Sequence, residues 1–183
     1  MKYIQNMLLA FGLLWCSVAL ATNDALAQPS AADYRLGSGD LIKIHVFGED
    51  DLTLQFKLGD SATISYPFLG ELKLQGVTPG ELEKLVYNGL LGDYLVAPVV
   101  NVSILAYRNF YIHGEVKKPG GYPFQPGMTL SKAVSLAGGF TDRASKTKIF
   151  TVHDFDRDKN KVQLDLHSPV MPGDIITVEQ SFF

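Results

Sequence analysis

Short alternating hydrophobic segments, separated by turns rich in glycine and proline, follow one another from residue 34 onward. Alternation with a period of two places apolar side chains on one face of a β-strand, and turn residues bound such strands. In the first half the pattern predicts strands at residues 41–47, 53–58, 62–66, 71–74 and 98–106. In the second half it predicts strands at residues 109–115, 147–154, 162–166 and 175–178, with a short extended piece at 122–124.

Two segments instead have hydrophobic residues at helical spacing. Residues 79–91 follow Thr78, which can cap a helix, and Glu81 completes a capping box. A second helix is predicted after Thr129, and the glycine pair at 138–139 is a typical helix end.

Two features of the first half recur in the second half in the same order. Residues 39–44 resemble residues 173–178, and a Pro-Phe pair, a turn and a threonine-capped helix occur at both 67–91 and 123–137. Such turn-plus-strand patterns are common, but two echoes in one order favour a pair of related modules. We therefore predict an α+β protein whose modules span residues 33–108 and 109–183.

The N-terminus has the features of a secretory signal peptide. Lys2 precedes an apolar run at residues 7–21, and Ala-Leu-Ala triplets end at residues 21 and 27. Small residues at −3 and −1 fit signal peptidase, so residues 1–27 are predicted to be removed, with cleavage after residue 21 as the second choice. An N-terminal membrane anchor is the alternative, but the run is shorter than the roughly 20 residues that a span needs.

The cysteine content limits the covalent chemistry. Cys16 is the one cysteine, and the preceding Trp15 is not the small residue that a lipoprotein signal requires. We expect no lipidation and, after cleavage, a chain without disulfides or thiol chemistry.

Composition indicates a globular protein without a nucleic-acid partner. Hydrophobic residues make up 46% of the chain and charged residues 19%, with a net charge of −3. These fractions are typical of a folded domain, and a nucleic-acid interface needs a concentrated basic face.

Residues that could support catalysis are few and scattered. Glu49, Asp50 and Asp51 form an acidic run that is typical of a solvated loop, because carboxylates that act in catalysis face each other across a cleft. The four histidines have no metal-ligand spacing, and nucleophile and phosphate-loop motifs are absent from the sequence. We expect no enzyme activity, no metal and no cofactor.

Three groups of side chains are candidates for binding. Basic residues near the turns of the second module are either a solvated face or a contact for an acidic polymer or a neighbouring subunit. Aromatic residues near the module boundary are predicted to pack in the core or an interface rather than to stack on sugars. These two groups are Lys117, Lys118, Arg143, Lys146 and Lys148, and Tyr107, Phe110, Tyr111, Tyr122 and Phe124.

The third group is the terminal pair Phe182 and Phe183. Two large apolar side chains at a chain end favour burial. They dock either on their own module or on a partner, and we predict the partner.

The order and spacing of several motifs resemble the polysaccharide export protein family, whose best-known members are Wza-like translocons. Residues 34–44, 64–82 and 98–102 resemble the opening, central and closing motifs of its export module. Residues 110–139 and 170–178 resemble its soluble-ligand-binding β-grasp (SLBB) module. The resemblance covers nearly all of the chain after residue 33.

This resemblance implies a periplasmic protein that forms a ring-shaped homo-oligomer and helps to export a capsule or exopolysaccharide with an inner-membrane co-polymerase. Five residues follow Val178, too few for the outer-membrane helix of long members. The chain is therefore similar to short members, which are thought to work beneath a separate outer-membrane β-barrel. The alternative function is a monomeric periplasmic module that binds a small soluble ligand and regulates polysaccharide assembly.

Overall fold

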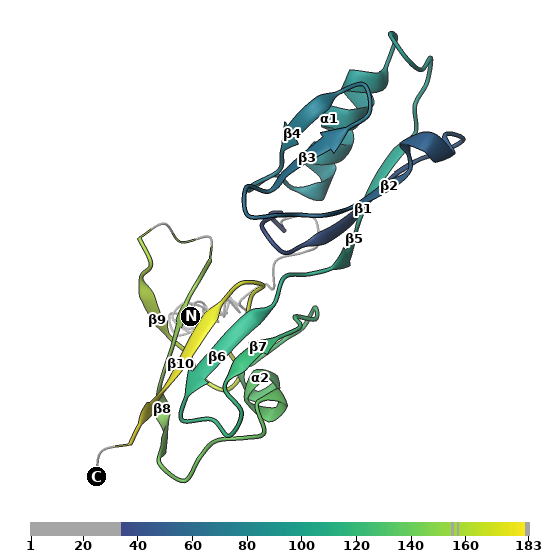
Figure 1. Ribbon diagram of the computed structural model, residues 1–183. Helices are drawn as coiled ribbons and strands as arrows, with labels where there is room; N and C mark the ends of the chain where they lie inside the picture. The colour runs from purple at the N-terminus through teal and green to yellow at the C-terminus, as the bar shows by residue number, and fades with distance from the viewer. Residues whose placement is uncertain (1–33, 155, 157, 182–183) are drawn as a thin grey trace, which may run out of the picture.

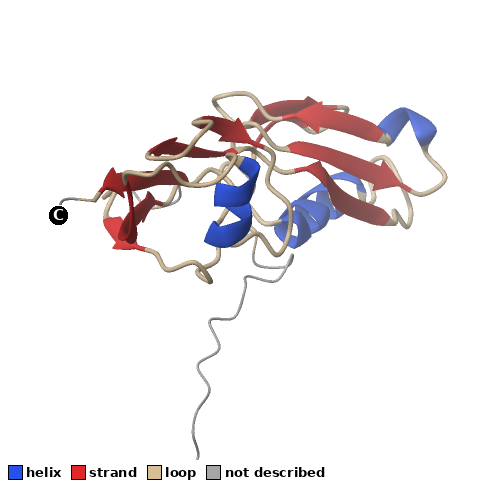
Figure 2. Ribbon diagram, turned by 90° about the horizontal axis from the view of Figure 1, so that it is seen from below, coloured by secondary structure: helices blue, strands red, loops and turns tan. Residues whose placement is uncertain are grey.

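The computed structural model describes residues 34–154, 156 and 158–181. Within these residues the chain forms ten β-strands, two α-helices and one short 3₁₀ helix. Figures 1 and 2 show an elongated molecule in which two modules lie end to end. The predicted α+β class with two modules is confirmed, and the predicted boundaries at residues 33, 108 and 109 stay predictions.

The first module combines a three-stranded sheet with a hairpin and a helix. The sheet has the order β2-β1-β5, and β1 pairs antiparallel with both neighbours. Its elements are β1 (Leu41–Val46), β2 (Leu54–Lys57), β5 (Val100–Ala106), the hairpin β3 (Thr63–Tyr66) and β4 (Gly70–Lys73), and α1 (Pro79–Leu90).

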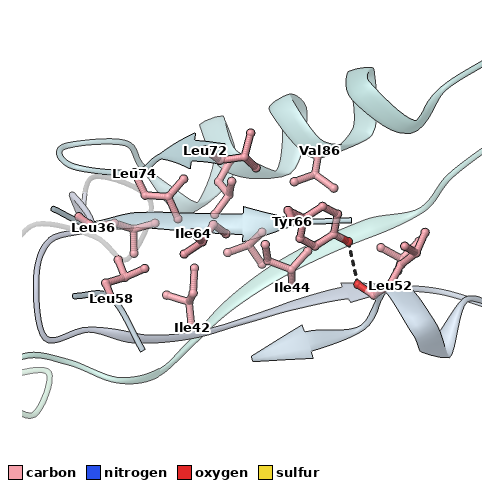
Figure 3. Close-up of a cluster of buried hydrophobic side chains, with 14 of the residues drawn as sticks. Leu36, Ile42, Ile44, Leu52, Leu58, Ile64, Tyr66, Leu72, Leu74 and Val86 are labelled. Carbon is pink, nitrogen blue, oxygen red and sulfur yellow. Dashed lines mark hydrogen bonds between the residues drawn. The ribbon is translucent and has the colours of Figure 1, made fainter. Parts of the chain in front are cut away.

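A single hydrophobic core holds the first module together. Alternate residues of β1, including Ile42 and Ile44, pack with α1 residues and with Tyr66 from β3. The buried Tyr66 hydroxyl donates a hydrogen bond of 2.7 Å to the carbonyl oxygen of Leu52, as Figure 3 shows. Burial raises the pKa of Tyr66 to about 12, so the phenol remains a donor.

The helix α1 begins with the predicted capping box. The Thr78 hydroxyl accepts the backbone N–H of Glu81 at 3.2 Å, and the Glu81 carboxylate accepts the N–H of Thr78 at 2.8 Å. These bonds satisfy backbone donors that a helix start leaves unpaired.

The second module contains a five-stranded sheet in the order β7-β6-β10-β8-β9. The last strand, β10, lies in the centre, parallel to β6 and antiparallel to β8. The elements are β6 (Phe110–Gly114), β7 (Gly120–Tyr122), α2 (Leu130–Leu136), β8 (Ala144–Val152), β9 (Lys161–Gln163) and β10 (Ile175–Gln180).

The two faces of this sheet differ. One face, which includes Ile112 and Ile176, packs against α2 in the second core. The strand register places Tyr111, Ile175 and Val152 side by side on the other face. Tyr111 and Ile175 are exposed there.

Some predicted boundaries were wrong. Strand β7 starts at Gly120, inside the predicted turn, because residues 120–122 pair with β6. Strand β8 starts at Ala144, earlier than residue 147, through its pairing with Gln180. The acidic run at 49–51 is exposed, as expected, and overlaps the 3₁₀ helix Asp50–Leu52.

Across the residues described, no helix is both long and apolar enough to cross a membrane.

Candidate functional site

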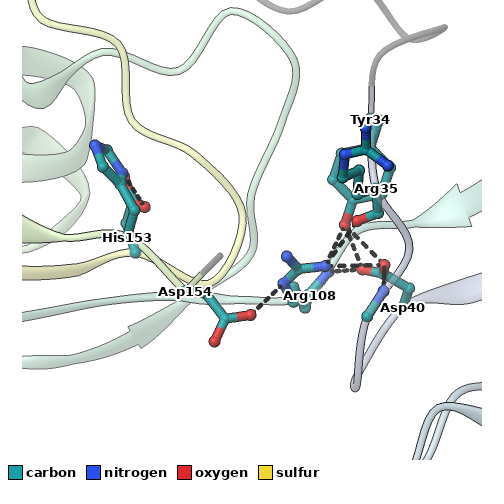
Figure 4. Close-up of polar contacts among 8 residues, drawn as sticks. Tyr34, Arg35, Asp40, Arg108, His153 and Asp154 are labelled. Atoms are coloured by element: carbon teal, nitrogen blue, oxygen red, sulfur yellow. Dashed lines mark hydrogen bonds and ion pairs between the residues drawn. The ribbon is translucent and has the colours of Figure 1, made fainter. Parts of the chain in front are cut away.

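The connection between the modules is three residues long, from Tyr107 to Asn109 between β5 and β6. At its centre Arg108 extends its guanidinium between the first module and a loop of the second (Figure 4). The Arg108 side chain is only 11% exposed. A buried charge is costly unless it is paired and hydrogen-bonded. The partners of Arg108 therefore identify the contacts that hold the two modules together.

On the side of the first module Arg108 meets Asp40, whose side chain is 0% exposed. Nη1 of Arg108 lies 3.1 Å from Oδ2 of Asp40 and donates to the Tyr34 hydroxyl at 2.8 Å. The backbone N–H of Arg108 donates to Oδ1 of Asp40 at 2.8 Å. The Tyr34 hydroxyl in turn donates to Asp40, at 2.7 Å to Oδ2.

The surroundings of Tyr34 keep its phenol protonated. Burial, and then the neighbouring Asp40 carboxylate, raise the pKa of Tyr34 far above its ordinary value. Tyr34 therefore stays protonated and acts as a donor. The buried carboxylate accepts bonds from Tyr34, Gly37 and Arg108, which compensates for its removal from water.

On the side of the second module Arg108 meets Asp154. Nε of Arg108 lies 3.2 Å from Oδ2 of Asp154, an ion pair that lacks hydrogen-bond alignment. The Asp154 side chain is 41% exposed. This pair is therefore more screened by water than the pair with Asp40.

The two glycine–aspartate echoes of the sequence form matching turns at this junction. Oδ2 of Asp40 accepts the N–H of Gly37 at 2.9 Å, and Oδ2 of Asp174 accepts the N–H of Met171 at 2.8 Å. Gly39 and Gly173, which precede the aspartates, have φ of +93° and +87°. Both turns contact Arg108, because a Cβ on either glycine would lie 3.1 Å or less from its side chain.

Asp174 is the counterpart of Asp40 but has a different partner. Its Oδ1 lies 2.8 Å from Nδ1 of His153. Burial raises the pKa of Asp174, and the Met171 N–H and His153 act in the opposite direction.

A pocket of about 440 Å³ opens beside Arg108. Its wall combines the Gly39 turn and Lys57 of the first module with Asn109, Tyr111 and Asp154 of the second. The volume is within the range of about 300–1,000 Å³ that is typical of small-molecule sites.

The predicted basic residues lie elsewhere. Strand β6 runs away from the junction and β8 runs back toward it, so the turns at 115–119 and 140–143 lie at the far end of the second module. These turns are in contact, since the backbone N–H of Thr141 donates to the carbonyl oxygen of Glu115 at 3.2 Å. The structure brings together the segments with Lys117, Lys118 and Arg143, whereas Lys146 and Lys148 lie along β8, and all five side chains are exposed.

The aromatic candidates divide into packed and exposed residues. Phe110 is buried and stacks on Tyr122 with ring centroids 6.0 Å apart. Tyr107 contacts Tyr34 and Phe124 edge-on, at 4.9 and 5.4 Å between centroids. Tyr111 differs, because its side chain is 51% exposed at the pocket.

Sequence reasoning missed Asp40, Arg108 and Asp154 at the junction, and Lys57 and Asn109 in the pocket wall. The repeated Gly-Asp pair was noticed as turn chemistry, and it was the available signal for two buried carboxylates. Nothing in the local pattern around Arg108 indicates that it bridges two modules. Phe182 and Phe183 lie outside the described residues, as does the predicted signal peptide.

In the described part of the chain, no group of three or more His, Asp or Glu side chains could hold a metal ion. His45 lies 3.1 Å from the Thr53 hydroxyl, and His113 lies 3.0 Å from the Thr177 hydroxyl. The junction offers hydrogen-bonding groups, an exposed aromatic ring and balanced charges, which suit binding and positioning.

Comparison with known proteins gives two domain matches in the order of the two modules. Residues 28–105 match the polysaccharide biosynthesis/export protein family, and residues 109–162 match the SLBB domain. Arg108 lies between the two matched segments.

Proteins with similar sequences are named as exopolysaccharide production or export proteins. Exopolysaccharide production protein ExoF of Rhizobium meliloti is 32% identical, over 68% of this chain and 34% of ExoF. The EPS I polysaccharide export outer membrane protein EpsA is 30% identical in Ralstonia nicotianae and 29% in Ralstonia solanacearum, over 60% of this chain in both cases. The match spans 35% and 36% of the EpsA chains, so this chain matches about a third of each relative. The chain belongs to the polysaccharide biosynthesis/export protein family, with an SLBB domain as its second module.

Proposed function

We propose that the protein is a periplasmic, non-enzymatic component of a machinery that exports a capsule or exopolysaccharide. Copies of the chain associate and frame part of an aqueous path for the polymer. The observation that carries this proposal is the pairing of an export domain with an SLBB domain in one chain, over residues 28–105 and 109–162.

The contacts at the junction support a structural role for having both domains in one chain. Arg108 contacts the buried Asp40 of one module and Asp154 of the other. A subunit of a conduit must hold its domains at a fixed angle to meet its neighbours, and ion pairs across a short connector provide such a constraint.

The partners follow from the family resemblance. We propose that the assembly receives polymer from an inner-membrane co-polymerase and delivers it to a separate outer-membrane β-barrel. Phe182 and Phe183 are proposed to dock on that barrel. Export of the chain to the periplasm requires the signal peptide at residues 1–27, and N-terminal sequencing of the exported protein is expected to begin at Gln28.

The exposed basic residues of the second module, at its far end and along β8, have a proposed role as well. Lys117, Lys118, Arg143, Lys146 and Lys148 would contact an acidic polymer or a neighbouring subunit. Such contacts weaken with salt, because exposed charges are screened beyond about 10 Å at 0.1 M ionic strength.

Deletion of the gene tests the export role. We expect secreted and surface polysaccharide to fall sharply, with recovery on complementation by the wild-type gene. Undiminished secretion by the deletion strain, with the full-length polymer outside the cell, would contradict the proposal.

The second candidate function is a monomeric regulatory module that binds a small soluble ligand. The pocket of about 440 Å³ at the junction favours this alternative. The number of subunits in the native state separates it from the assembled conduit.

A further inference from the structure

The junction pocket has the properties of a sugar-binding site, beginning with a flat aromatic surface. Tyr111 on β6 pairs with Gly121 on β7, and a Cβ at Gly121 would lie 2.9 Å from the Tyr111 ring. The ring therefore lies across the glycine, where any larger residue would displace it. Its outer side remains open, since the side chain is 51% exposed.

The neighbouring strand extends this apolar surface. Ile175 on β10 is paired with Tyr111 and is 43% exposed. Both residues line the pocket. The C–H groups of a pyranose ring carry partial positive charge and fit the negative face of an aromatic ring.

Polar groups surround the aromatic surface on the side of the module junction. Lys57, Asn109 and Asp154 have exposed side chains in the wall of the pocket. In the described part of the chain, Nη2 of Arg108 and Oδ1 of Asp154 make no hydrogen bond. These groups can donate to and accept from hydroxyl groups, which act as both donors and acceptors.

The charges at the pocket are balanced. Lys57 and Asp154 line the pocket as one cation and one anion, and Arg108 is neutralised from behind the wall by the buried Asp40. A strongly anionic ligand would be repelled by Asp154, and a strongly cationic ligand would be repelled by Lys57 and Arg108. The arrangement therefore fits a neutral polyhydroxylated ligand.

We propose that the pocket binds a short neutral segment of the exported polysaccharide, with one sugar ring stacked on Tyr111 and its hydroxyls bonded to Asn109 and Asp154. The identity of the polymer rests on the proposed function. Both modules contribute to the pocket, so sugar binding also depends on the junction at Arg108.

Direct binding to the purified full-length mature protein tests this site. The probe is a set of oligosaccharides from partial hydrolysis of the producing strain's own secreted polysaccharide, titrated while amide chemical shifts are recorded. We expect the largest shifts at Asn109, Tyr111 and Gly173. Shifts confined to the far end of the second module, around Lys117 and Arg143, would overturn the proposed site.

Two substitutions of Tyr111 separate stacking from folding. Tyr111→Phe keeps the ring face, so its dissociation constant should stay within about threefold of wild type. Tyr111→Leu keeps apolar cover over Gly121 but removes the ring, and we expect binding about tenfold weaker, equivalent to about 1.4 kcal/mol. Tyr94→Leu, at an exposed tyrosine of the first module, is the matched control and should bind as wild type.

The remaining outcomes distinguish this site from the export role. Affinity that changes little between about 0.05 and 0.5 M salt supports a neutral ligand, whereas affinity that collapses with salt contradicts it. Equal binding by Tyr111→Leu and wild type would overturn the stacking site without affecting the export role. Normal polysaccharide export by the deletion strain would instead contradict the proposed export role, regardless of which ligand the pocket binds.

Discussion

Arg108 lies between two carboxylates at the module junction. Its guanidinium is nearly buried, and its two carboxylate partners differ in exposure, with Asp40 at 0% and Asp154 at 41%. A hydrogen bond to a buried charged group contributes more than an exposed ion pair. The contact with Asp40 should therefore dominate the stability of the junction.

Arg108→Met tests this ranking, because methionine keeps an apolar stem and removes the charge. We expect the free energy of unfolding to fall by about 1.5–3 kcal/mol, since Asp40 loses one charged donor but keeps Tyr34, Gly37 and a backbone N–H. Asp154→Asn should cost less than about 1 kcal/mol. Urea unfolding of both variants measures the difference, and an equal cost would contradict the ranking.

The loss of Arg108 should also make the two modules unfold independently. In the wild type we expect one cooperative transition, and in Arg108→Met two transitions recorded by calorimetry. The control is Arg35→Met, at an exposed arginine whose side chain donates to the carbonyl oxygen of Gly76. Well-separated transitions in the wild-type protein would argue against close packing of the modules.

Tyr66→Phe tests the buried hydrogen bond in the first core. The change leaves the carbonyl oxygen of Leu52 without its partner, so we expect a loss of about 1–3 kcal/mol. Tyr87→Phe, at a half-exposed site on α1, is the control and should have little effect. Equal stability of Tyr66→Phe and wild type would show that water replaces the phenol.

The pKa of Tyr66 adds a pH dependence to this comparison. Because the folded-state pKa is raised to about 12, the contribution of Tyr66 is complete below the ordinary pKa of about 10 and is lost as pH rises toward 12. The stability gap between wild type and Tyr66→Phe should therefore narrow across this alkaline window. A constant gap would contradict the raised pKa.

At the scale of elements, the matching Gly39–Asp40 and Gly173–Asp174 turns set the shape of the junction. Each glycine has a positive φ that side chains rarely adopt, and each lies against Arg108. The turns place one buried aspartate at the start of β1 and another at the start of β10. One local structure is thus used twice to position the two sheets around one arginine.

Gly173→Ala tests the second turn. A Cβ there would lie 2.8 Å from both Nε of Arg108 and Cβ of Asp154, at a φ of +87°. We expect a loss of about 1–3 kcal/mol in the free energy of unfolding. The control is Gly59→Ala, with no atom within 4 Å of the added Cβ, which should change the free energy of unfolding by less than about 1 kcal/mol. If Gly59→Ala lost as much stability as Gly173→Ala, steric contact with Arg108 and Asp154 would not explain the loss at Gly173.

The capping box of α1 predicts an acid dependence. The N–H of Thr78 lowers the pKa of Glu81 below its ordinary value of 4.5. A lowered pKa means that the stabilisation is present above 4.5 and is lost as pH falls through the folded-state pKa. Glu81→Gln should melt at a lower temperature than wild type at neutral pH, with a gap that closes on acidification.

The control for this comparison is Glu71→Gln, which removes a charge from an exposed position on β4. A melting-temperature gap for Glu81→Gln that is the same at neutral and acidic pH would contradict the role of the carboxylate in the cap.

The sequence allowed the elements to be predicted where local chemistry decides them. Thr78 and Glu81 specified α1 through a cap that needs no tertiary contact. Strand β7 was misplaced because Gly120 and Gly121 resemble a turn, and only the pairing with β6 makes them a strand. Arg108 and Asp40 lie 68 residues apart in sequence, so their contact is a property of the folded chain. Tyr111 could be selected as aromatic, but its exposure depends on Gly121 across the sheet.

At the scale of the whole molecule, two candidate binding regions lie at opposite ends of the second module. The junction pocket has balanced charges and an aromatic surface, while the far end has exposed basic residues. The first region suits contacts with neutral sugars, and the second suits acidic groups of a polymer or a neighbouring subunit. We expect an assembly of such subunits to present both regions at defined positions, because Arg108 pairs with an aspartate of each module.

We infer that the protein works as an assembled subunit rather than as a single regulatory module. The decisive experiment is native mass measurement of the complex, extracted gently from the cell envelope. We expect a single species with a mass that is a fixed multiple of the mature subunit, before and after removal of outer-membrane partners. A monomer at cellular concentration, with polysaccharide export intact, would contradict it.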